Sequence, residues 1–149
     1  QWMRRYLMIC FGALVVYVLY PMAPPWMASR EGLMGEVTRR TGRGWDDLGT
    51  GRLDLFLQGV GNPVAAMPSL HAGIAFLVAV HGVQRLRSPW RWLLLAYPAL
   101  MSLALVYFAE HYVVDIVAGA VLALAVVAVA GLWERQPGVG PGQVGTVRE

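Results

Sequence analysis

The sequence predicts an all-α fold, a polytopic bundle of transmembrane helices. Hydrophobic residues make up 57% of the 149 residues and charged residues only 14%, whereas soluble domains contain about 25% charged residues. The apolar residues gather in runs of roughly the ~20 residues that a bilayer requires. Pro-, Gly- and Arg-containing segments separate these runs, as in loops at a membrane surface. We therefore expect one membrane domain over residues 1–135 and a flexible tail over residues 136–149.

Four apolar runs predict four membrane helices, and they lie near residues 3–20, 69–86, 90–108 and 113–133. The apolar part of the first helix begins directly after Arg4 and Arg5, and the helix stops before Pro21, because proline interrupts a helix. The second is short for a straight span, so we expect it to be tilted or buried within the bundle. The third is almost wholly apolar. The fourth contains Gly119 and Ala123, a small-xxx-small step that permits close helix packing.

The distribution of arginine predicts the orientation in the membrane. A polar loop, residues 21–61, joins the first two runs, and a short turn, residues 84–91, joins the next two. Each membrane helix carries the chain to the other side of the membrane. The loop therefore lies on one side, and the turn and both chain ends lie on the other. The arginines on the turn side are Arg4, Arg5, Arg85, Arg87, Arg91, Arg135 and Arg148, and those in the loop are Arg30, Arg39, Arg40, Arg43 and Arg52. Arginines close to helix ends favour the cytoplasm, so we expect an integral plasma-membrane protein with residues 21–61 outside.

The composition also excludes several classes of protein. Cys10 is the only cysteine, which excludes a disulfide framework. The high apolar content excludes a disordered chain. The net charge of +3 comes from dispersed arginines, with no dense basic run, so we expect no nucleic-acid partner. All 12 basic residues are arginine, and any site here must function without lysine.

Two segments place ionisable residues at the start of a predicted helix. Residues 66–73 contain His71 at the start of the second run, and residues 110–115 contain His111 at the start of the fourth. The second and third runs form an antiparallel hairpin. His71 begins that hairpin and His111 follows its end, so we expect both at the same outer face of the membrane.

These residue types are suited to phosphoryl chemistry. His111 and Asp115 are four residues apart and share a helix face, so the carboxylate can fix one ring nitrogen and leave the other to attack. Pro68 and Ser69 are typical of a helix start, and the free N–H groups there bind phosphate. His71 in the first turn can protonate a leaving oxygen. The residues therefore indicate a nucleophile, an orienting group, an acid and an anion cradle at one interface.

Two other interpretations stay open on the residues alone. Polar groups cost little at a membrane interface, so the histidines and Asp115 could be structural, although such residues near membrane helices are usually functional. His71, Glu110, His111 and Asp115 are also metal-ligand types. Glu110 and His111 are sequence neighbours, however, and point to different helix faces. We therefore expect no metal and no cofactor.

The two segments resemble motifs of the type 2 phosphatidic acid phosphatase superfamily of membrane enzymes. Residues 68–71, Pro-Ser-Leu-His, are similar to its second motif, usually Pro-Ser-Gly-His. Residues 111–115, a His followed four residues later by Asp, are similar to the end of its third. With residues 23–26 and 62–64, the pattern resembles the inositol phosphorylceramide synthase branch, and the resemblance extends over about residues 21–131.

The resemblance implies a bundle of usually six membrane helices, so we expect further helices upstream of Gln1. It implies that His111 takes the phosphoryl group as a phosphohistidine, that His71 protonates the leaving alcohol, and that Asp115 orients His111. The phosphate-binding residues it implies are Ser69 and Leu70, and the residues we expect around the substrate are Pro25, Trp26, Asn62, Glu110 and Tyr112. The active site would then lie on the extracytoplasmic face.

The implied function is metal-independent cleavage of a phosphoester in a lipid phosphate or phospholipid headgroup. Water as acceptor makes the protein a lipid phosphatase. An alcohol acceptor such as inositol or a sugar makes it a phosphotransferase that forms a phosphodiester lipid. A second alternative is a catalytically weak lipid-binding protein with the same fold. The sequence contains no signal for an oligomeric state.

The chain departs from the superfamily pattern in its cations. The first motif of the superfamily has a Lys and an Arg that bind phosphate, whereas this chain has no Lys and has Trp26 where many relatives have Arg. The third motif usually has an Arg six residues before its His, a position that Leu105 occupies here. A phosphoryl transition state needs its charge stabilised. We expect Arg43 and Arg52 of the outer loop to supply that charge.

Overall fold

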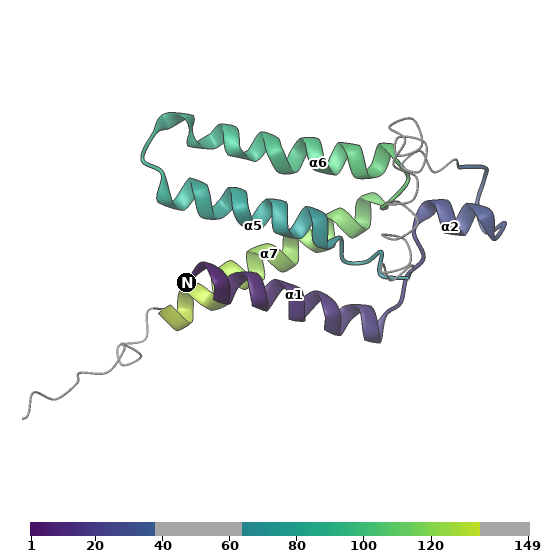
Figure 1. Ribbon diagram of the computed structural model, residues 1–149, viewed down its shortest axis with the longest axis horizontal. Helices are drawn as coiled ribbons and strands as arrows, with labels where there is room; N and C mark the ends of the chain where they lie inside the picture. The colour runs from purple at the N-terminus through teal and green to yellow at the C-terminus, as the bar shows by residue number, and fades with distance from the viewer. Residues whose placement is uncertain (38–63, 135–149) are drawn as a thin grey trace, which may run out of the picture.

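The computed structural model describes residues 1–37 and 64–134, in which the regular elements are helices (Figure 1). The elements are α1 (Trp2–Leu19), α2 (Pro25–Arg30), α5 (Leu70–Arg85), the 3₁₀ helix η1 (Pro89–Leu95), α6 (Ala96–Tyr107) and α7 (Val113–Glu134). The described residues form no β-strand, only an isolated bridge between Met22 and Ala65. The predicted all-α class is confirmed. The predicted tail, residues 136–149, lies outside the described residues.

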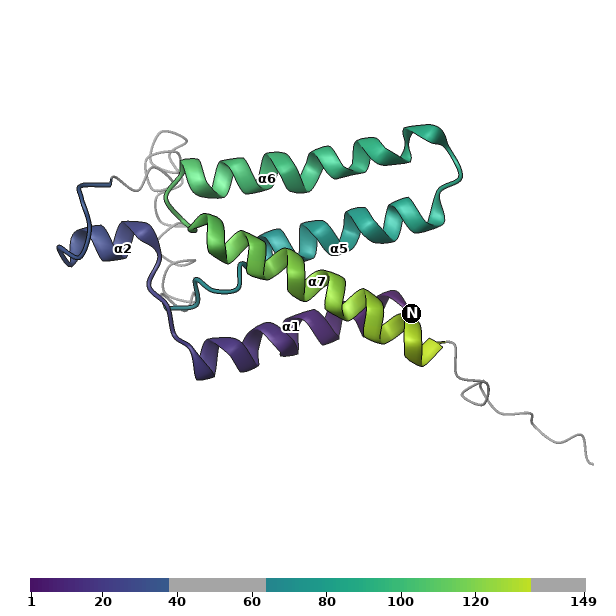
Figure 2. The same cartoon turned by 180° about the vertical axis from the view of Figure 1, so that it is seen from behind.

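Helix α5 lies at the centre of the arrangement. It packs against α7, α1 and α6, and α7 also packs against α1. Figures 1 and 2 show α5 and α6 side by side as an antiparallel hairpin, with α7 passing diagonally across α5 and α1. The short α2 lies beyond the end of the bundle where α1 finishes. The same end contains the start of α5 and the start of α7, which brings both histidine segments together.

Three segments are long and apolar enough to cross a membrane: α1, the combined stretch Pro89–Tyr107, and α7. These three segments are consistent with an integral membrane protein. Large apolar side chains such as Phe11, Leu103 and Leu124 are more than half exposed. Such surfaces suit lipid, because hydrocarbon chains solvate them without a penalty.

The second predicted membrane helix is shorter than a full span. Helix α5 has 16 residues and a length of about 24 Å, against the ~30 Å of a hydrocarbon core. It begins after the capping residue Ser69 and ends at Leu86, which has an extended backbone. The buried positions along it are Ala72, Gly73, Ala75, Leu77 and Ala79. Enclosure by the other helices, rather than lipid, thus provides much of its apolar environment.

The third run also differs from a single regular helix. Its first part is the 3₁₀ helix η1, in which Pro89 follows Ser88 and the Ser88 side chain accepts a hydrogen bond from the Trp90 N–H. Helix α6 starts at Ala96. A proline at the first helical position is favoured because its missing N–H has no helical partner there.

Close packing of α5 on α7 depends on two glycines. A Cβ atom on Gly119 would collide with the carbonyl oxygen of Ser69, and a Cβ on Gly73 would come within 3.2 Å of the Gly119 carbonyl oxygen. The two backbones therefore touch directly near the start of α5. Ala123, one turn further along α7, is 1% exposed and belongs to the core with Leu77. The close approach predicted at Gly119 and Ala123 is confirmed.

At the opposite end of the bundle, polar side chains join three helices. Arg5 of α1 pairs with Glu134 of α7 at 3.0 Å and donates a hydrogen bond to Gln84 of α5 at 3.2 Å. The Arg5 and Glu134 side chains are only 9% and 15% exposed. A partly buried pair of this kind is costly to break, because one charge would remain without its partner. It fixes the relative positions of the three helix ends.

Candidate active site

The loop between α6 and α7 places His111 at the end of the bundle. Helix α6 stops at Tyr107, and Ala109 has a positive φ of 59°, a conformation uncommon for residues other than glycine. The carbonyl oxygen of Leu105 accepts hydrogen bonds from the N–H groups of Glu110 and His111, at 3.0 and 3.3 Å. This tight reversal turns the chain back so that α7 can start at Val113.

The start of α5 is attached to the first turn of α7. Ser69 caps α5, because its Oγ accepts a hydrogen bond from the Ala72 N–H at 3.3 Å. The Ser69 N–H donates to the Asp115 carbonyl oxygen at 2.9 Å. Ser69 is fully buried. The helix start predicted at Pro68 and Ser69 is confirmed, and a hydrogen bond joins it directly to the segment that contains His111.

This attachment brings His71 and His111 together. Their ring centroids are 6.1 Å apart and the rings meet edge to face at 61°. His111 is 8% exposed, whereas His71, in the first turn of α5, is exposed. Parity of the helices predicts that both lie at one face, and the structure agrees. His111 is therefore enclosed by neighbouring residues, whereas His71 is accessible to an incoming molecule.

Asp115, four residues after His111, contacts the His111 ring and is completely buried. Its Oδ2 accepts a hydrogen bond from the Tyr112 N–H at 2.8 Å and lies 3.5 Å from Nδ1 of His111. That separation is an ion-pair contact without hydrogen-bond geometry, and neither His111 Nδ1 nor Asp115 Oδ1 has a hydrogen-bond partner among the described residues. Catalytic hydrogen bonds are often long without substrate. The predicted pairing at i, i+4 is present as a contact, and Nδ1 is the ring nitrogen that faces the carboxylate.

Helix α2 covers the loop that holds His111. The Trp26 N–H donates to the Ala109 carbonyl oxygen at 3.3 Å, and Pro25 at the start of α2 is buried. The Tyr112 hydroxyl donates to Sδ of Met34 at 3.7 Å. These two hydrogen bonds connect residues 24–34 to the loop that contains His111 and to the residue that follows it. Glu110 lies in the same loop and is partly exposed.

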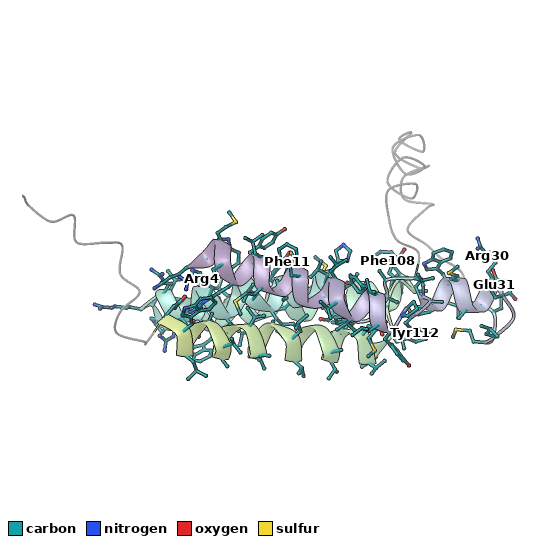
Figure 3. The ribbon with its side chains drawn as sticks, turned by 90° about the horizontal axis from the view of Figure 1, so that it is seen from below. Arg4, Phe11, Arg30, Glu31, Phe108 and Tyr112 are labelled. Carbon is teal, nitrogen blue, oxygen red and sulfur yellow. The ribbon has the colours of Figure 1, made fainter. Side chains whose placement is uncertain are left out.

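The cations that we expect at the site are not among the described residues. Arg43 and Arg52, together with Asn62, lie outside the part of the chain that the structure describes. Arg30 is described, and its guanidinium stacks over the Trp26 ring at 5.5 Å and pairs with Glu31 at 3.6 Å. Figure 3 shows Arg30 and Glu31 at the tip of α2, farther from the bundle than Tyr112.

The alternative metal site has no matching geometry. Within residues 1–37 and 64–134, no three side chains of His, Cys, Asp or Glu converge as ligands of one ion. The four candidate ligands therefore do not form a shared site among themselves. His71 and His111 approach each other as rings, and Asp115 is directed at His111 from below.

Tyr17 is a residue of this site that the sequence did not indicate. Its hydroxyl donates a 2.8 Å hydrogen bond to the carbonyl oxygen of Pro68, immediately before the α5 cap. Tyr17 belongs to α1, more than fifty positions away in the chain. Its position in an otherwise apolar run resembled that of an interfacial tyrosine, so only the packing of α1 on α5 could reveal the contact.

Comparison with known families identifies the fold. The family model of the PAP2 superfamily matches residues 1–129. The chain belongs to the PAP2 superfamily. The matched stretch contains both histidine segments and Asp115, and membership indicates a lipid phosphatase or phosphotransferase in general terms. No curated protein and no solved structure matches the chain. PAP2 membership thus agrees with the helical membrane fold and with the family resemblance of the motifs.

Proposed function

We propose that this PAP2 protein cleaves a phosphoester of a lipid phosphate or phospholipid headgroup through a phosphohistidine on His111. The observation that best supports this proposal is the arrangement of three groups from two helices. An exposed His71 faces a held His111 at 6.1 Å, and a fully buried Asp115 backs His111 at 3.5 Å. We assign to these three groups the roles of acid, nucleophile and orienting carboxylate that covalent phosphoryl transfer requires.

In the proposed first step, Nε2 of His111 attacks phosphorus. Nδ1 faces Asp115, so Nε2 is the nitrogen left for attack. The N–P bond forms as the P–O bond to the leaving alcohol breaks, and protonated His71 gives its proton to that oxygen. Asp115 stabilises the positive charge that develops on the His111 ring, as the carboxylate of a catalytic triad does.

In the second step, an acceptor is activated and the enzyme is regenerated. Neutral His71 takes a proton from water or from an alcohol as the acceptor oxygen attacks phosphorus. The N–P bond breaks, and the electron pair returns to Nε2 of His111. His71 is again protonated and the cycle closes. The same two histidines serve hydrolysis and transfer, so the chemistry of the acceptor determines the product.

Phosphate binding in this proposal combines the α5 start with the outer loop. Ser69 and Leu70 form the phosphate-binding end of α5, where helix N–H groups favour an anion. Arg43 and Arg52 supply the cations that Lys and Arg provide in other members. Pro25, Trp26, Asn62, Glu110 and Tyr112 surround the substrate. The distribution of arginine supports an extracytoplasmic site, and we propose the plasma membrane as its location.

Hydrolysis and transfer are separated by the products. We propose hydrolysis as the first reaction, and transfer to inositol or a sugar-type alcohol as the alternative that resemblance to the inositol phosphorylceramide synthase branch favours. The purified protein is incubated with lipid phosphates and with phospholipids, with and without added inositol. From a lipid phosphate, inorganic phosphate identifies hydrolysis, and inositol phosphate identifies transfer. From a phospholipid, a phosphomonoester identifies hydrolysis, and a new phosphodiester lipid that requires the added alcohol identifies transfer.

A weak lipid-binding protein is the second candidate, because Leu105 and Trp26 occupy positions where relatives have phosphate-binding arginines. In that case the fold would bind lipid without turning it over. The two candidates differ in how function responds to His111→Ala. A binding protein keeps lipid affinity and cellular function in the variant, whereas an enzyme loses its product.

Activity is expected to persist in excess EDTA. No step of the proposed reaction uses a metal, because His111 provides the nucleophile and His71 transfers the protons. The measurement is the initial rate of phosphate release in EDTA, compared with the rate after EDTA is removed and Mg²⁺ or Zn²⁺ is added. A rate that falls to background in EDTA and returns with metal would overturn the proposed mechanism.

Tyr17→Phe is expected to lower kcat about five-fold. The variant keeps the ring but leaves the Pro68 carbonyl without its donor, and one hydrogen bond contributes about 1 kcal/mol. The lost bond loosens the turn that positions His71, so kcat should fall more than KM rises. Tyr6→Phe, on the same helix but exposed, serves as the control. Equal kinetics for the two variants would show that Tyr17 does not position the site.

A further inference from the structure

A groove runs along the outer surface of the bundle between α1 and α7, with a volume of about 510 Å³. Its α1 wall extends from Arg4 to Phe11 and its α7 wall from Leu122 to Val129. On each helix the lining positions follow the i, i+3, i+4, i+7 spacing of one face. Ala125, the smallest side chain of the α7 wall, leaves room between the two helices. Arg4, at one end of the groove, and Tyr112, the residue that follows His111, lie at opposite ends of the bundle (Figure 3).

Arg4 is the single charged residue that lines the groove, and the other lining residues are apolar. Its guanidinium lies 5.5 Å from the ring centroid of Trp133, near the end of α7. Among the described residues no carboxylate pairs with Arg4, whereas the neighbouring Arg5 is paired with Glu134. The groove therefore has an apolar wall along most of its length and, at one end, a cation that no carboxylate of the described residues neutralises.

An apolar groove with a cation at one end matches the shape of a phospholipid, which has apolar acyl chains and a charged headgroup. Tryptophan and arginine are typical of the headgroup level, with apolar side chains below them. The Arg4 end is also the end that the arginine distribution predicts to face the cytoplasm. Anionic lipids are concentrated in the cytoplasmic leaflet, where each nearby Lys or Arg contributes about 1 kcal/mol to their attraction.

We propose that the α1–α7 groove binds an anionic phospholipid of the cytoplasmic leaflet, with one acyl chain along the groove and the phosphate on Arg4. This lipid is not the substrate, because its site lies at the opposite membrane face from His71 and His111. The proposal goes beyond the proposed function and does not depend on it.

Charge argues against a second copy of the chain as the occupant. In a two-fold symmetric dimer the same patch meets itself, so two parallel copies joined at this groove would bring their Arg4 side chains together. Like charges in a poorly solvated interface are unfavourable. A phosphate group supplies the opposite charge, and a flexible acyl chain fills an apolar channel without requiring a complementary surface.

Native mass spectrometry of the delipidated full chain tests the proposal. The protein is mixed with equal amounts of phosphatidylglycerol and phosphatidylcholine that have the same acyl chains. Arg4→Gln removes the cation and Ala125→Phe fills the groove. Arg87→Gln, an exposed arginine of the inner turn, and Ala128→Phe, an exposed alanine of α7 outside the groove lining, are the matched controls.

The wild-type protein and both controls should bind one phosphatidylglycerol about five-fold more strongly than phosphatidylcholine, a ratio equivalent to the ~1 kcal/mol of one arginine. Arg4→Gln should lose the preference, and Ala125→Phe should lose both lipids. Equal binding of the two lipids to the wild type would overturn the proposal. So would variants that behave like their controls, or Ala125→Phe changing the oligomeric mass while lipid binding stays constant. Phosphate release assayed on the same samples tests the active site separately.

Discussion

His111→Ala is expected to abolish product formation, with a loss in kcat of about 10⁴-fold or more. Alanine removes the nitrogen that we propose attacks phosphorus, and no other side chain in the described site offers a replacement nucleophile at that position. The buried Asp115, whose Oδ2 lies 3.5 Å from Nδ1 of His111, would lose its contact with the ring. The measurement is the release of phosphate from a panel of lipid phosphates, and the formation of a new phosphodiester from a panel of phospholipids with added alcohol.

His71 and His81 provide the comparison for this variant. His71→Ala should lower kcat by about 10²–10⁴-fold, as expected for loss of a general acid. His81→Ala should leave kcat near the wild-type value, because His81 packs on Trp2 toward the other end of α5. Product formation that survives in His111→Ala at wild-type levels would eliminate His111 as the nucleophile.

Gly119→Ala is expected to have the largest effect on stability. The new Cβ would collide with the carbonyl oxygen of Ser69, and that atom is backbone rather than a flexible side-chain end. Relief requires α7 to move away from the start of α5, and overpacking of this kind costs about 1–3 kcal/mol. The shift also strains the hydrogen bond from Ser69 N–H to the Asp115 carbonyl oxygen. Stability and activity should therefore fall together.

Thermal unfolding in detergent and phosphate release measure these two effects. Gly131→Ala is the matched control, because it lies on the same helix and a Cβ there meets nothing within 4 Å. Its unfolding temperature should equal or exceed that of the wild type, since alanine favours a helix over glycine. If Gly119→Ala and Gly131→Ala unfold at the same temperature, the close contact of α5 with α7 is wrong.

The juxtaposition of the two histidines could be predicted because it depends on few facts. The apolar runs determine how often the chain crosses the membrane. The number of crossings determines which helix ends lie on the same side. His71 and His111 follow from that parity, and the 6.1 Å between their rings agrees. The capping role of Ser69 was predictable for a similar reason, since Pro-Ser before an apolar run is a local signal.

Other features depend on packing that no local pattern encodes. The Tyr17 contact requires the rotation of α1 relative to the α5 start, and nothing in an apolar run specifies it. The short length of α5, bounded by the cap at Ser69 and the extended backbone at Leu86, agrees with the short second apolar run, but the helices that enclose α5 are determined by packing. The absence of a carboxylate partner for Arg4 among residues 1–37 and 64–134, in contrast to Arg5 with its partner Glu134, also required the structure.

The most direct test is to trap the covalent intermediate. The protein is mixed with a lipid phosphate labelled with radioactive phosphorus, quenched within the first turnover in denaturant, and separated from lipid. The wild type should retain label that is stable to alkali and released by acid, as expected of a phosphohistidine, and His71→Ala should retain it as well or longer. His111→Ala should retain none. Label in His111→Ala, or a wild type that forms product with no labelled protein at any time, would contradict a phosphohistidine on His111.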